Sequence, residues 1–177
     1  MVRYLLLGIV FVSMGAGWRQ PVLRVSTCGL VRDPLAYNGK MVRVRAVTAP
    51  GPAFSLLMNC RAPYPHGIAL AFTDEAPIKP PVPFKTRYDR DMKKFLHYLN
   101  AKREIKLPKG WVAPPWAYAK YCKITVTITG RFDAVSREDV TWGRGYGEAG
   151  EYPYRIVVGS VANPVAKECP QSSPPSK

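Results

Sequence analysis

Side chains that could bind a ligand gather in two parts of the sequence. The first is residues 60–67, CRAPYPHG, where Arg61, Tyr64 and His66 lie close together just before an expected strand. Binding residues are often found on loops held by a rigid scaffold, so this loop is one candidate site. The alternative is a proline-shaped loop with a structural role. The other histidine, His97, stands alone, and metal ligands come in clusters, so we predict no metal site.

The second part is a basic and aromatic segment, residues 79–123. Cations mixed with aromatic rings suit a protein that follows a phosphate backbone while bases stack on its rings. The tryptophans of this segment are flanked by prolines, and they could instead hold a long loop against the rest of the protein. We favour this structural interpretation. The candidate binding residues of the segment are Arg90, Lys93, Lys94 and Trp111.

The sequence contains no recognised catalytic or cofactor motif. G-x-S-x-G, H-E-x-x-H and the P-loop pattern are all missing, and the glycine-rich WGRGYGEAG precedes an expected strand instead of opening a helix. Nothing in the order of the residues brings together an acid, a base and an oriented nucleophile. We therefore predict a non-enzymatic protein without a cofactor.

Composition points to one domain with a basic surface. The chain has 177 residues, and its 18 prolines and 14 glycines favour a loop-rich, β-rich fold over a helical bundle. Lysines and arginines number 26 against 12 acidic residues, which gives a net charge of +14. Such a surface attracts anionic polymers. The alternative is a generally basic protein with no dedicated anionic partner.

The N-terminus and the cysteines predict export. The segment MVRYLLLGIVFVSMGAGW has an early arginine, an apolar run and then small residues, which is the pattern of a signal peptide over residues 1–17. The apolar run is shorter than the roughly 20 residues that a membrane-spanning helix needs. The even number of cysteines suits an oxidising compartment and allows three pairings of Cys28, Cys60, Cys122 and Cys169. We expect a monomer in the periplasm or outside the cell.

Hydrophobic periodicity predicts a mainly β fold. Alternation is clearest in residues 41–47 and 123–129, and further strands are expected at 54–58, 67–72 and 155–162. A short helix precedes the first strand, and a longer helix beginning at Thr86 separates the third strand from the fourth. This order predicts an OB-like five-stranded Greek-key barrel, with an irregular sandwich as the alternative. We expect the barrel domain at residues 22–163, with an insertion at 73–121, and a disordered proline- and serine-rich tail at 164–177.

The opening motif resembles that of a known group of proteins. Its pattern, C-x-L-x-x-x-P-x-x-Y-x-G-K-x-V-x-V from Cys28 to Val44, is similar to the start of uncharacterised secreted bacterial proteins with an OB-like barrel. The later GYGEAGEYPYRIVVGSV is similar to their closing segment, with Glu148 where these proteins commonly have histidine. The resemblance implies an OB-like barrel and brings no activity. Within such a barrel we favour a disulfide between Cys28 and Cys60, with Cys122 and Cys169 pinning the tail to the fourth strand.

Two functions follow as hypotheses, beside a weaker third, which is an enzyme whose site would come from scattered residues. The first is a non-enzymatic, exported binding or interaction module of the cell envelope with an unknown partner. The alternative is an electrostatic binder of an anionic polymer, either single-stranded nucleic acid or an acidic envelope polysaccharide.

Overall fold

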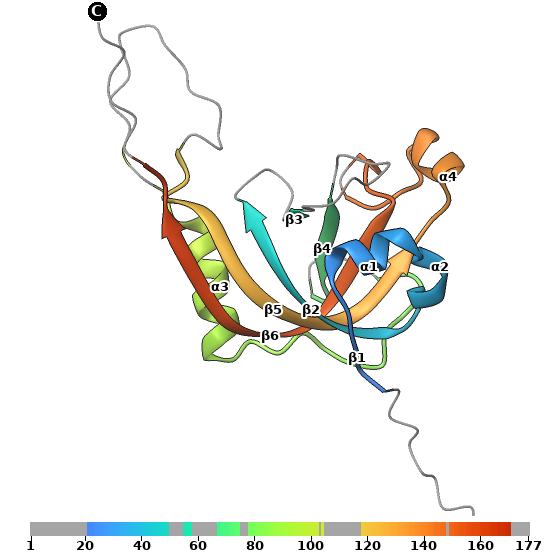
Figure 1. Ribbon diagram of the computed structural model, residues 1–177, viewed down its shortest axis with the longest axis horizontal. Coiled ribbons are helices and arrows are strands. Elements are labelled where there is room, and N and C mark those ends of the chain that lie inside the picture. The colour runs from blue at the N-terminus through green and yellow to red at the C-terminus, as the bar shows by residue number, and fades with distance from the viewer. Residues whose placement is uncertain are drawn as a thin grey trace, which may run out of the picture.

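The computed structural model of the protein is built around one curved sheet of six strands (Figure 1). The structure describes residues 21–49, 55–57, 67–74, 78–102, 104, 118–147 and 149–170. The strands are β1 (Leu23–Arg24), β2 (Met41–Ala49), β3 (Ser55–Leu57), β4 (Ile68–Phe72), β5 (Tyr121–Ala134) and β6 (Tyr154–Glu168). The helices are α1 (Thr27–Arg32), α2 (Pro34–Tyr37), α3 (Arg90–Asn100) and α4 (Arg137–Thr141). The predicted mainly β fold is therefore confirmed.

The sheet closes into a ring. Its strands follow the order β2-β3-β4-β6-β5, and β5 then pairs back with β2 along residues 41–48. The neighbours within the ring are antiparallel except β4 and β6, which are parallel. The short β1 adds to β2 in parallel. Closure pairs the backbone groups that an open sheet would leave exposed at its edges.

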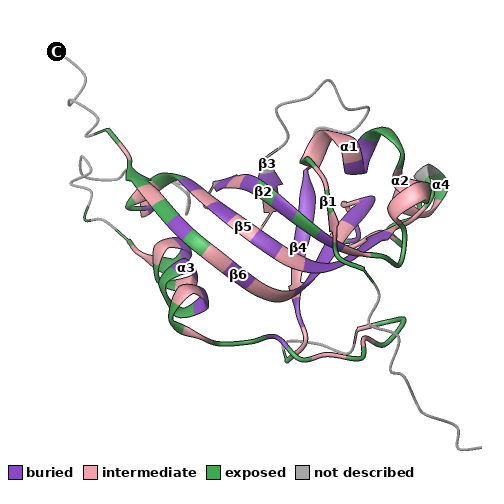
Figure 2. Ribbon diagram, turned by 60° about the horizontal axis from the view of Figure 1, so that its bottom comes forward, coloured by how far each residue is buried: buried purple, intermediate pink, exposed green. Residues whose placement is uncertain are grey.

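Alternation along the strands fills the ring with apolar side chains. Val42 and Val44 of β2 and Ile124, Val126 and Ile128 of β5 are fully buried, while the residues between them are exposed or half-buried. Figure 2 shows this alternation along β2. Because successive side chains of a strand point to opposite faces, the register of β2 and β5 decides which residues reach the outside.

Helix α3 packs its apolar side chains into the same core as the sheet and begins later than expected. Its Met92, Phe95 and Leu99 are buried, and it contacts β5 and β6. The prediction that the helix begins at Thr86 is wrong, because the N-cap is Asp89, whose carboxylate accepts a hydrogen bond of 3.0 Å from the backbone N–H of Met92.

Thr86 has a different role, and this explains the later start of the helix. Its hydroxyl donates a hydrogen bond of 2.8 Å to the carbonyl oxygen of Val158 in β6, and its backbone N–H donates to the hydroxyl of Thr73 over 2.8 Å. Thr86 therefore holds the segment before α3, the connector, against β6 of the sheet.

The last strand is longer than expected. Residues 164–168 were predicted to open the disordered tail, but they belong to β6 and pair with the N-terminal part of β5. This pairing provides backbone hydrogen bonds that the sequence alone does not reveal. The predicted disulfide between Cys122 and Cys169 is confirmed, and it joins the N-terminal part of β5 to the residue that follows β6.

Several other predictions fall outside the described residues. The expected signal peptide, Cys60 and the last seven residues, 171–177, are not described, and the half-buried Cys28 has no disulfide partner among the residues that are. The pairing of Cys28 with Cys60 therefore stays a prediction. In the described part of the chain, no helix is long and apolar enough to cross a membrane.

We predict that removing the disulfide, in the variant C122S/C169S, lowers the free energy of unfolding by about 4 kcal/mol in the chain-entropy estimate for a sequence separation of 47. The measurement is urea unfolding of the oxidised protein and of the variant. A loss for Cys28→Ser of similar size would support the Cys28–Cys60 pair. Equal unfolding curves for C122S/C169S and the unchanged protein would contradict the structural role of the bond.

Candidate functional site

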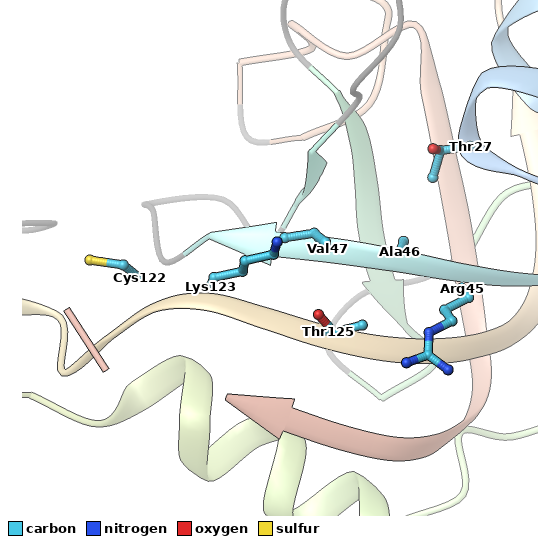
Figure 3. Close-up of a pocket in the computed structure, with 7 residues that line it drawn as sticks. All are labelled: Thr27, Arg45, Ala46, Val47, Cys122, Lys123 and Thr125. Atoms are coloured by element: carbon cyan, nitrogen blue, oxygen red, sulfur yellow. The ribbon is translucent and has the colours of Figure 1, made fainter. Parts of the chain in front are cut away.

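A groove runs along the outside of β2 and β5. It consists of two hollows of about 520 and 500 Å³ that share Arg45. The described residues of the larger hollow are Thr27, Arg45, Ala46, Val47, Cys122, Lys123 and Thr125 (Figure 3). Those of the smaller hollow are Arg24, Val25, Ser26, Arg43, Arg45 and Thr127. We call the two hollows together the basic groove.

The floor of the basic groove is set by the pairing of β2 with β5. Because Val42 and Val44 point into the core, Arg43 and Arg45 point out. Arg43 lies opposite Thr129, and Arg45 lies opposite Thr127. The Nε of Arg43 donates a hydrogen bond of 3.1 Å to the Oγ1 of Thr129. Guanidinium and hydroxyl groups therefore stand side by side on this surface.

One wall of the basic groove comes from β1 and the turn into α1. Arg24 pairs with Arg43 in the parallel register, and the N–H of Val25 donates to the carbonyl oxygen of Arg43 over 3.1 Å. Ser26 caps α1 by accepting a hydrogen bond of 3.0 Å from the N–H of Gly29. The cap fixes the chain direction at this point and places Ser26 and Thr27 at the rim.

The far end of the basic groove lies beside the disulfide. Cys122 lines the larger hollow, and the next residue, Lys123, is exposed. The bond between Cys122 and Cys169 ties this end of β5 to the end of β6. Lys123 therefore lies on a part of β5 that is held to β6 by strand pairing and by the disulfide.

The basic groove carries positive charges that no described acidic side chain neutralises. Four cations line it: Arg24, Arg43, Arg45 and Lys123. All are exposed, and within the described part of the chain none of them forms an ion pair. Like charges on directly paired residues are unfavourable, as for Arg24 and Arg43, and a bound anion would relieve this repulsion.

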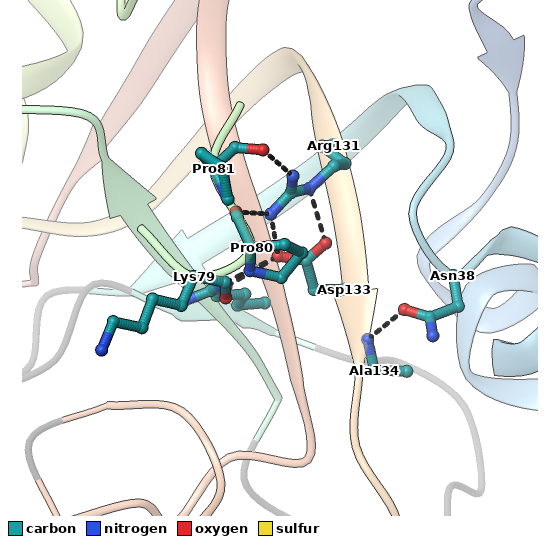
Figure 4. A network of polar contacts seen from close by, with 8 residues as sticks. Asn38, Lys79, Pro80, Pro81, Arg131, Asp133 and Ala134 are labelled. Carbon is teal, nitrogen blue, oxygen red and sulfur yellow. Dashed lines mark hydrogen bonds and ion pairs between the residues drawn. The ribbon is translucent and has the colours of Figure 1, made fainter. Parts of the chain in front are cut away.

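A second cluster of charged residues is buried and has its partners within the chain (Figure 4). The carboxylate of Asp133 accepts hydrogen bonds of 2.7 and 2.9 Å from Arg131 and one of 2.9 Å from Arg155. Arg131 also donates to the carbonyl oxygens of Pro80 and Pro81, and Arg155 donates to that of Lys79. The cluster fastens the connector to the ends of β5 and β6, which is a structural role.

Tyr146 borders this cluster. The guanidinium of Arg155 lies 4.3 Å from the centre of its ring. Burial, followed by the negative charge of Asp133, raises the pKa of Tyr146 above its usual value, so the phenol stays neutral at physiological pH. Since its partners are internal, the cluster presents no open position for a substrate. Among the described residues, no group of three or more histidine, cysteine, aspartate or glutamate side chains could hold a metal ion.

The residues that were predicted as binding residues do not line the basic groove in the described structure. Arg61, Tyr64, His66 and Trp111 lie outside the described residues. Arg90, Lys93 and Lys94 are exposed on α3, where the ammonium of Lys94 lies 5.7 Å from the centre of the Tyr98 ring. These three form a separate basic surface, the α3 surface.

Sequence reasoning missed the cations of the basic groove. Arg43 and Arg45 lie exposed on the strand that was predicted at residues 41–47, but no ligand was assigned to them. The available signal was the pattern Arg-x-Arg on one strand and Thr-x-Thr-x-Thr on another. Its meaning depends on the pairing of these two strands, which are far apart in the sequence.

Comparison of the chain with protein-family models, curated proteins and solved structures finds no significant match. The resemblance of the opening motif to secreted bacterial proteins therefore stays a prediction.

We predict that Asp133→Asn destabilises the fold by about 3 to 5 kcal/mol, because it leaves two largely buried guanidinium groups without their carboxylate. Urea unfolding measures the change. The matched control is Glu168→Gln, which breaks the exposed ion pair with Lys120 and should barely move the midpoint. Equal small effects of the two substitutions would show that the cluster does not fasten the connector.

Proposed function

We propose that the protein is an exported, non-enzymatic binding module of the cell envelope, built on an OB-type barrel, and that it binds an anionic ligand in the basic groove. The observation that carries the proposal is the set of four exposed cations without ion pairs in the described chain, gathered along one groove. An anion bound there would pair with charges that the fold itself leaves uncompensated.

The strand order supports an OB-type barrel. When β2 to β6 are counted as strands one to five, the ring runs one, two, three, five, four and returns to one. A five-stranded Greek-key ring with a helix after its third strand suits this class of barrel, which often binds extended polymers. Fold alone does not assign a ligand, so the argument for binding rests on the groove.

The disulfide supports export. Disulfides persist in oxidising compartments and are rare where thiols are kept reduced. The bond between Cys122 and Cys169 agrees with the apolar, small-residue pattern at the N-terminus, which predicts a signal peptide.

The chemistry of the lining supports binding over catalysis. Arginine stays protonated at any physiological pH, so Arg24, Arg43 and Arg45 can hold an anion but cannot act as a general base. The described lining residues include no histidine or carboxylate that could exchange a proton. A site of this composition positions and retains its ligand.

We predict that the variant R43A/R45A binds a fluorescent dextran sulfate at least about tenfold more weakly than the unchanged protein, because two guanidinium contacts are lost. Fluorescence anisotropy at increasing salt measures the affinity. The slope of log affinity against log salt should also become shallower by about two ion equivalents.

The matched control is R90A/K93A, which removes the same charge from the α3 surface. This variant should keep most of the affinity. An equal loss in both variants would mean that binding follows net charge, and it would contradict the groove as a dedicated site. A larger loss in R90A/K93A would move the site to α3.

A further inference from the structure

We infer that the ligand of the basic groove is an acidic polysaccharide, a chain that carries anionic groups and hydroxyl groups together. This inference rests on the proposed function and names the class of ligand. Three features of the groove support it: the spread of its cations, the hydroxyl groups between them, and an open stretch of strand edge.

The cations are spread over a length that suits a chain. Arg43 and Arg45 are two residues apart on β2, which corresponds to about 7 Å along a strand. Arg24 lines only the smaller hollow, and Lys123 lines only the larger one. A single small anion cannot contact both ends, whereas a chain with repeated anionic groups can meet each cation in turn.

Hydroxyl groups lie beside the cations. Thr127 lies opposite Arg45 and Thr125 lies opposite Val47, while Ser26 and Thr27 line the other side. A serine or threonine hydroxyl both donates and accepts hydrogen bonds, as a sugar hydroxyl does. The guanidinium forks suit carboxylate or sulfate groups. The lining therefore matches a ligand in which both kinds of group recur.

The edge of β2 is open beside this surface. In the described chain, β1 pairs with β2 at Val42 and Arg43, and β3 pairs with it from Val47 onward. Residues 44–46 pair with β5 alone. The carbonyl oxygen of Arg43 faces β1, because it accepts from the N–H of Val25. Main-chain groups alternate in direction along a strand, so those of Arg45 face the same side and can bond to ligand hydroxyls.

The described lining residues do not favour nucleic acid. Single-stranded nucleic acids bind by stacking their bases on aromatic rings, and none of the described lining residues is aromatic. Two pairs of described rings are engaged with each other elsewhere: Tyr98 with Tyr121 at 4.9 Å between centroids, and Phe132 with Tyr154 at 5.9 Å. The charge of the groove alone would attract a nucleic acid as well. The serine and threonine hydroxyls of the lining are the feature that favours a polysaccharide over a nucleic acid.

The test compares three polyanions at physiological salt: a sulfated oligosaccharide with free hydroxyls, oligothymidylate, which carries bases, and linear polyphosphate, which carries neither bases nor hydroxyls. Competition against the fluorescent dextran sulfate gives each affinity. The variant T125V/T127V keeps the shape and charge of the groove and removes two hydroxyls. This variant should lower the affinity for the oligosaccharide about tenfold, as expected for two lost hydrogen bonds. The affinity for polyphosphate should stay within about twofold of its original value.

The inference is supported if the oligosaccharide binds most tightly of the three ligands and if T125V/T127V lowers the affinity for the oligosaccharide alone. Tighter binding by oligothymidylate or polyphosphate, or equal weakening of all three ligands in T125V/T127V, overturns it. In those cases R43A/R45A would still weaken every ligand, so the proposed function would survive. Failure of all three to bind would overturn both.

Discussion

The pairing of β5 with both of its neighbours is the constraint on which the rest of the structure depends. Residues 121–134 form one long strand that pairs with β2 on one edge and β6 on the other, and this double pairing closes the ring. The apolar residues of β5 then meet those of β2 inside, and a single core is buried. At one end the disulfide secures the strand, and at the other the Asp133 cluster secures the connector. Strands that fill such a core cannot slip by one residue without exposing it.

The same register also determines the chemistry of the outer surface. Because Val42 and Val44 face the core, Arg43 and Arg45 point outward. The pairing of β2 with β5 places threonines opposite these two arginines. β1 and the cap of α1 then form a wall beside these side chains. The two clusters of arginines thus have different roles. Arg131 and Arg155 bind a buried carboxylate and stabilise the fold, whereas the cations of the basic groove have no such partner in the described chain and, as we propose, bind an anionic ligand.

Local patterns in the sequence predicted most of the strands, and the rest depended on contacts between distant segments. Alternation located β2 and much of β5, because a strand with one buried face shows its period directly. The start of α3 was misplaced, because Thr86 is as good a cap as Asp89 until the connector binds it to β6. The end of β6 was missed because only its pairing with β5 orders residues that otherwise look like a tail. For the same reason the groove was not foreseen: its cations come from β1, β2 and β5, and only the closed ring brings them together.

The most direct test of binding in the basic groove is a map of ligand-induced changes in backbone NMR signals. The isotope-labelled, oxidised protein would be titrated with the sulfated oligosaccharide at physiological salt. We predict shifts in the amide signals of residues 24–27, 43–47 and 122–127, with the signals of α3 unchanged. Shifts centred on Arg90, Lys93 and Lys94, or spread evenly over the basic surface, would contradict it.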